Sequence, residues 1–73
     1  MNNTANANNT ISPYRAGTYV RVEQAGAVAF GRWVPHYRNG NFVSGVVVTN
    51  SQAHVHVSAA ALADGRAMIG RAR

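Results

Sequence analysis

Four short turn signals divide the sequence at nearly even intervals, and they constrain the fold more than any other feature. They are Ala25-Gly26, Asn39-Gly40, Asn50-Ser51 and Asp64-Gly65, which begin 14, 11 and 14 residues apart. Asn-Gly and Asp-Gly favour tight hairpins, because a type I′ turn needs positive φ at both central positions. Short runs between evenly spaced turns are typical of antiparallel sheets. The spacing therefore predicts a mainly β domain, a small antiparallel meander of about five strands.

The segments between the turns alternate as strands do. In GTYVRVEQ, Val20 and Val22 fall on one face, and Tyr19, Arg21 and Glu23 on the other. The β-branched run NFVSGVVVTN, the alternating AHVHVS and a weaker RAMIGRA supply three further strands.

The segment AVAFGRWVPHY supplies the remaining strand. It places Val28 and Phe30 on one side, and we expect a bulge at Gly31 to shift the phase after them. Pro35 has no N–H to donate, so we expect the strand to end there or to lie at a sheet edge.

The stretch SAAALADG has a second reading as a short helical turn near 58–64. Ser58 would be its N-cap and Gly65 its C′ residue, and Ala favours helices over strands. A strand, a helical turn and a basic end would resemble the small SH3-like barrels, which are the alternative to a plain meander.

Residues 1–13 form a separate compositional block, with five Asn among the first ten residues. Such a polar segment buries too little apolar surface to become ordered alone. We therefore predict an extended N-terminal arm that binds neighbouring subunits, in the way that added strands bind sheet edges, and a single β domain over 14–73. The predicted partner-binding residues are Asn2, Asn3, Asn6, Asn8, Asn9, Tyr14 and Arg15.

The chain has 73 residues and no cysteine, so disulfides and thiolate zinc sites are excluded. Domains this small often gain stability by oligomerisation. Glu23 and Asp64 are the only acids, so a single chain is not expected to form a catalytic carboxylate pair. No phosphate-binding glycine loop is present either. We expect a homo-oligomer or a subunit on a larger lattice, with no enzymatic activity, no cofactor and no small-molecule substrate.

Three histidines are candidate metal ligands. His54 and His56 point to the same face of a strand, and His36 is a third ligand if its strand pairs nearby. The alternative is that they are ordinary residues of a polar strand face. No carboxylate lies near them in the sequence to orient them, so no metal is predicted.

Seven Arg and no Lys give a formal net charge of +5, which favours an acidic partner such as nucleic acid or an acidic protein. Basic and aromatic residues interleave between 14 and 42, a pattern suited to base stacking and phosphate contacts. Alternatively, Phe30, Trp33 and Phe42 are simply the core, a reading that suits Phe30 and Phe42 better than Tyr19. The candidate contacts to nucleic acid or an acidic partner are Arg21, Arg32, Trp33, Tyr37, Arg38, Arg71 and Arg73.

The stretch VHVSAAAL, preceded by GTYVRV, is similar to the plasmid-borne type II dihydrofolate reductases over about a third of the chain. The resemblance implies a small SH3-like barrel that tetramerises around a shared pore. That family lines the pore with Val-Gln-Ile-Tyr, whereas this chain has Val55, His56, Val57 and Ser58. The lysine expected after the first strand is also missing. The resemblance thus implies the fold without the reductase activity.

The leading functional prediction is a structural subunit of a large symmetric assembly, of which a phage-type virion component such as a capsid decoration or minor structural protein fits best. The alternatives are a basic nucleic-acid-binding β-barrel and an oligomeric enzyme or histidine-based metal protein. No stretch approaches the ~20 apolar residues of a membrane span, and the start does not resemble a signal peptide. We expect the protein in a virion if it is phage-derived, and otherwise in the cytoplasm.

Overall fold

The structure is a computed structural model that describes residues 11–72, and it contains five strands and one helix in this range. The strands are β2 (Tyr19–Gln24), β3 (Ala27–Arg38), β4 (Asn41–Val48), β5 (His54–Ser58) and β6 (Ala67–Arg71), and the helix is α2 (Ala59–Asp64). The mainly β prediction is therefore confirmed.

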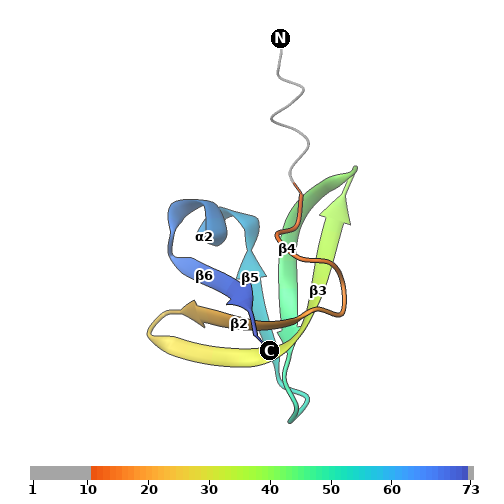
Figure 1. The fold of residues 1–73 in the computed structure, drawn as a ribbon. Helices are drawn as coiled ribbons and strands as arrows, with labels where there is room; N and C mark the ends of the chain where they lie inside the picture. Colours follow the sequence, from red (N-terminus) through yellow and green to blue (C-terminus); the bar gives the residue numbers. More distant parts are fainter. Residues whose placement is uncertain (1–10, 73) are drawn as a thin grey trace.

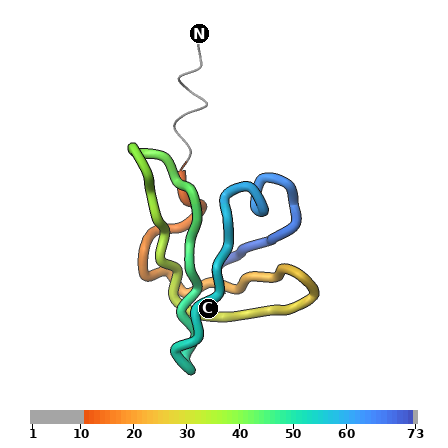
Figure 2. The backbone as a smooth tube through the Cα atoms, turned by 180° about the vertical axis from the view of Figure 1, so that it is seen from behind, coloured from red at the N-terminus to blue at the C-terminus, as the bar shows by residue number. Residues whose placement is uncertain are grey.

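All five strands form one antiparallel sheet in the order β5-β4-β3-β2-β6. Strands β2 to β5 lie side by side in sequence order, and β6 returns to pair with β2 after the helix. Figure 1 shows β4 and β5 running steeply across β2 and β6, with β3 curving from one group to the other. Figure 2 shows from behind that the described chain begins near the tip of the β3–β4 hairpin.

Two of the predicted turns have the backbone that tight hairpins require. Ala25 and Gly26 have φ values of 52° and 78°, and Asn39 and Gly40 have 52° and 82°. Positive φ at both central residues matches the right-handed twist of the flanking strands. These two turns make the hairpins β2–β3 and β3–β4.

Strand β3 bends without the predicted bulge at Gly31. Its pairing with β2 keeps one register from Tyr19–Arg32 to Gln24–Ala27, so the Gly31 bulge is wrong. The register shift lies instead between His36 and Tyr37, where β3 pairs with β4. Gly31 serves a different purpose, because a Cβ there would overlap the carbonyl oxygen of Val48.

Pro35 lies within β3 and does not end it. It is opposite Gly45 of β4, in the part of β3 that extends past the last residue pair with β2. Because β3 is the central strand of the sheet, the predicted edge position is wrong for the strand as a whole. Pro35 is tolerated because the β2 side of β3 has no ladder partner at this position.

Trp33 is the centre of the core. It is fully buried, packs against Phe42 with ring centroids 6.0 Å apart, and lies over Gly45. A Cβ at Gly45 would overlap the indole ring. The remaining buried members of the cluster are Val20, Val22, Val47, Val57, Ala61 and Ala67.

Phe30 does not belong to this core, which corrects the expectation that it would. Its side chain is 45% exposed, because Gly31 and Trp33 face inward and strand alternation turns Phe30 outward. Phe42 is buried as expected.

The helical reading of 58–64 is confirmed. The Oγ of Ser58 accepts a 3.0 Å hydrogen bond from Ala61 N, as an N-cap does. Gly65 ends the helix with φ 83°, and its N–H donates to the carbonyl of Leu62.

The segment before β2 is bound to the sheet. The Oγ of Ser12 accepts a 2.7 Å hydrogen bond from Trp33 Nε1 and donates one of 2.7 Å to the carbonyl of Tyr14. The N–H of Ser12 donates to the hydroxyl of Tyr37. Residues 11–13 of the predicted arm therefore lie against the β domain, and residues 1–10 fall outside the described range.

Candidate functional site

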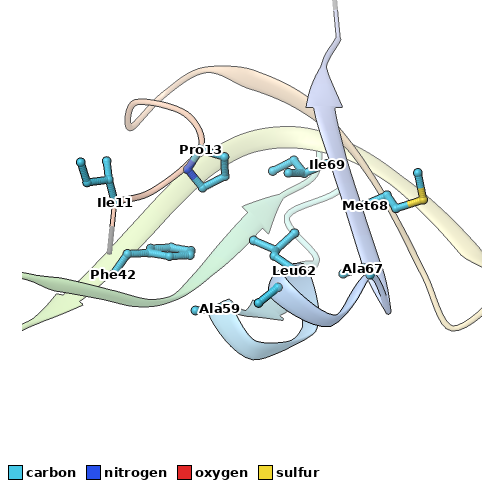
Figure 3. Close-up of a pocket in the computed structure, with 10 residues that line it drawn as sticks. Ile11, Pro13, Phe42, Ala59, Leu62, Ala67, Met68 and Ile69 are labelled. Atoms are coloured by element: carbon cyan, nitrogen blue, oxygen red, sulfur yellow. The ribbon is translucent and has the colours of Figure 1, made fainter. Parts of the chain in front are cut away.

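An apolar groove opens at one end of the curved sheet, and we call it the end groove (Figure 3). Phe42 of β4, Leu62 of α2 and Ile69 of β6 line it from within the domain, while Ile11 and Met68 stand at its rim. Its volume is about 550 Å³. Ile11 is 75% exposed and Met68 63% exposed.

The end groove exists because α2 and the start of β6 carry small side chains. Ala59, Ala63, Gly65 and Ala67 line it with methyl groups or bare backbone. They leave space that larger residues would fill, and the surface of the groove is therefore mostly apolar.

A second surface lies on the convex side of the β2–β3 hairpin, and we call its four side chains the outer face. Tyr19 is opposite Arg32 and Arg21 is opposite Phe30 in the register of the two strands. The inward neighbours Val20 and Val22 are buried, so alternation directs these four outward. Aromatic and guanidinium groups consequently alternate over a compact area.

The loop between β4 and β5 borders the outer face with two hollows. One, of about 550 Å³, is lined by Tyr19, Phe30 and the loop residues Asn50 and Ser51, among others. The other, of about 370 Å³, is lined by Arg32, Gln52 and neighbouring loop atoms. Thr49 and Asn50 line both hollows, so the two are adjacent.

Both acidic side chains are engaged by arginines. Glu23 lies 3.5 Å from Arg21, and Asp64 lies 2.9 Å from Arg66. Within residues 11–72, these are the ion pairs that form, which leaves four described guanidinium groups without a carboxylate. They are Arg15, Arg32, Arg38 and Arg71.

The three histidines do not gather around one point. His54 and His56 are exposed on the same side of β5, as the alternation predicted. His36 is opposite Ser44 of β4, which in turn is opposite Ser58 of β5. Two strand spacings, about 10 Å, therefore separate the backbone of His36 from that of β5. No group of three or more potential ligands occurs in the described part of the chain.

The other predicted contacts to nucleic acid or an acidic partner lie in different parts of the structure. Trp33 is fully buried and offers no stacking surface. Tyr37 packs edge-on against Phe42, and Arg38 lies at the tip of the β3–β4 hairpin. Arg71, at the end of β6, is exposed. Of the predicted contacts, Arg21 and Arg32 are brought together on the outer face.

Tyr14 and Arg15, both predicted to bind a partner, differ in their surroundings. Tyr14 packs against the core cluster, whereas Arg15 is exposed in a turn where its carbonyl accepts from Thr18 N. The candidates outside the described residues are Asn2, Asn3, Asn6, Asn8, Asn9 and Arg73.

Sequence reasoning did not assign the residues that line the end groove. Ile11 was included in a polar arm, and Leu62, Met68 and Ile69 have no polar pattern around them to mark a site. The predicted helix was the one signal in the sequence that could have indicated the end groove, because a short Ala-rich helix beside a strand leaves a shallow apolar hollow.

The described residues define a small, mainly β protein, with five antiparallel strands in one sheet and one short helix. No protein-family model, no curated protein and no solved structure matches the chain. The reductase resemblance therefore rests on the quoted residues alone, of which His56 and Ser58 are exposed on β5. No helix between residues 11 and 72 is long and apolar enough to cross a membrane.

Proposed function

We propose that this protein is a structural subunit of a protein assembly and that it binds a neighbouring subunit through the end groove. The observation that carries the proposal is the apolar groove of about 550 Å³ with Ile11 and Met68 exposed at its rim. Exposed apolar side chains that cluster around a hollow mark interaction sites more often than scattered ones do.

Domain size supports the same conclusion. A chain of 73 residues buries a modest share of its surface alone, and the core here contains one indole, one phenyl ring and several Val and Ala side chains. Covering Ile11, Leu62, Met68 and Ile69 would add apolar burial worth about 25 cal/mol per Å².

Edge strands offer a second mode of contact. β5 and β6 are the two edges of the sheet, and an exposed edge can accept an added strand from another chain. The edge of β5 is partly occupied, since Gln24 Nε2 donates a 2.8 Å hydrogen bond to the carbonyl of His56. β6 borders the end groove through Met68 and Ile69, so a strand added at this edge would adjoin the same surface.

The occupant we propose is a second copy of this chain, alone or on a larger lattice of the kind found in a phage-type virion. A groove at which each copy exposes Ile11 and Met68 is suited to a self-complementary contact, in which the same patch serves both partners. Binding and not catalysis is the proposed activity.

The native mass of the full chain, measured by light scattering, tests this proposal. We expect the unmodified protein to be an oligomer and the Ile11→Asp and Met68→Asp variants to dissociate, because each would place a carboxylate in an apolar contact. Val43→Asp is the matched control, since Val43 is exposed but does not line the groove. A monomeric unmodified protein, or equal dissociation of the control, would contradict the proposal.

A further inference from the structure

We propose that the outer face and the adjoining β4–β5 loop bind single-stranded nucleic acid. Bases would stack on Tyr19 and Phe30, and phosphates would contact Arg21 and Arg32. The site is separate from the end groove and does not depend on self-assembly.

The aromatic side chains are placed for stacking. Phe30 is 45% exposed and Tyr19 37% exposed, and neither belongs to the core cluster. Their strands are paired, with Tyr19 and Phe30 at diagonal positions of the ladder, which are about 7–8 Å apart. Aromatic rings of this kind bind bases without regard to sequence, because every base has a π face.

The arginines are placed between the aromatic rings. Each aromatic residue has an arginine directly opposite it, Arg32 for Tyr19 and Arg21 for Phe30. Arg32 forms no ion pair with any other residue between 11 and 72. Arg21 is 3.5 Å from Glu23, but both side chains are about half exposed, and such pairs contribute little in water. Arg21 therefore remains available to a phosphate.

Two open, shallow hollows of about 550 and 370 Å³ border the site. The aromatic hollow also contains Asn50 and Ser51, whose amide and hydroxyl groups can pair with base edges. The second hollow contains Arg32. A base in the first hollow would place its phosphate near the second.

Hydrogen bonds between its own residues close the loop that borders the two hollows. Thr49 N donates to the carbonyl of Ala53, and Gln52 N donates to that of Thr49, both at 2.9 Å. The hydroxyl of Thr49 also accepts from Ala53 N at 3.1 Å. A pre-formed wall reduces the ordering cost of binding.

A single strand suits this face better than a duplex or an acidic protein. In a duplex the base faces are stacked inside, so Tyr19 and Phe30 would have nothing to stack on. An acidic polypeptide would form ion pairs with the arginines, but it would offer no flat ring for Tyr19 and Phe30 to stack on. The net charge of +5 favours a polyanion in either case.

Fluorescence anisotropy with a short labelled single strand, its duplex and poly-glutamate as competitor tests the proposal. We expect single-strand binding that weakens between 50 and 200 mM salt, since phosphate contacts release counterions. Phe30→Leu keeps an apolar side chain on the exposed position and should weaken binding by about five- to a hundred-fold through lost stacking.

Two arginine variants distinguish binding at a specific site from nonspecific attraction by the net positive charge. Arg32→Ala should reduce the slope of log affinity against log salt by about 0.7. Arg38→Ala removes the same charge at the tip of the β3–β4 hairpin and should change affinity less than about twofold. Glu23→Gln should tighten binding because it removes the carboxylate beside Arg21.

Thermal unfolding of each variant confirms that the fold is intact. Three outcomes would overturn the proposal. The first is the absence of single-strand binding at 50 mM salt. The second is an equal loss of affinity in Arg32→Ala and Arg38→Ala, with no effect of Phe30→Leu. The third is binding of the duplex or of poly-glutamate that is as strong as, or stronger than, binding of the single strand.

Discussion

The indole Nε1 of Trp33 donates a 2.7 Å hydrogen bond to the Oγ of Ser12, which joins the segment before the first strand to the centre of the core. The Trp33 side chain is fully buried, so its indole N–H would have no hydrogen-bond acceptor without Ser12. This bond and the one from Ser12 N to the hydroxyl of Tyr37 hold Ser12 against the β domain.

Ser12→Ala should lower the free energy of unfolding by about 1–3 kcal/mol, because it leaves a buried donor without an acceptor. Chemical denaturation measures the change. Ser51→Ala is the control, since its hydroxyl is exposed and pairs only with Thr49, and it should cost less than about 0.5 kcal/mol. Equal stability of the two variants would contradict this account of Trp33.

Gly45→Ala should destabilise the protein by about 1–3 kcal/mol or more, because the added Cβ would overlap the ring of Trp33. Gly31→Ala should behave similarly, since its Cβ would meet the backbone at Val48. The control is Gly70→Ala, where no atom lies within 4 Å of the added Cβ. It should be neutral or stabilise by up to about 1 kcal/mol, as thermal unfolding can measure.

Ser58→Ala should cost about 0.5–2 kcal/mol, because it removes the oxygen that accepts from Ala61 N at the start of α2. Ser58→Asp should restore most of this loss, since aspartate is also a good N-cap. Amide exchange at Ala61 is a local measure of the cap. If alanine and aspartate were equally unstable, the cap would not be the cause.

Gln24→Ala should cost about 0.5–1.5 kcal/mol, because Gln24 Nε2 joins the end of β2 to the β5 edge at the carbonyl of His56. Gln24→Glu has nearly the same shape but no donor in its ionised form, so it should lose as much or more. Hydrogen exchange along β5 reports the loosening of this edge. Full stability of the glutamate variant would mean that the hydrogen bond contributes nothing.

Local signals in the sequence predicted most of the fold. Asn39-Gly40 and Ala25-Gly26 act within a few residues, and so do the Ser58 and Gly65 caps. Each was read correctly because the chemistry of a turn or cap depends on its own residues. The pairing of β6 with β2 depends on packing between residues that are far apart in the sequence, and no local sequence pattern predicts it.

The phase of β3 was the principal error, and Gly31 was its cause. The inward positions of the strand include Gly31 and Trp33, so only one large side chain marked the buried face. Val28 and Phe30 gave the stronger alternation, but they are on the outer side. The outer face was consequently predicted only in part, through Arg21 and Arg32.

The two ends of the described chain border different surfaces. Ile11 stands at the rim of the end groove, while Ala72 N donates a 2.9 Å hydrogen bond to the carbonyl of Tyr19 beneath the outer face. A fluorophore carried at position 11 would thus respond to subunit contacts, and one at position 72 to ligands on the convex side. Dual labelling of a single molecule would then show whether both surfaces are occupied at once.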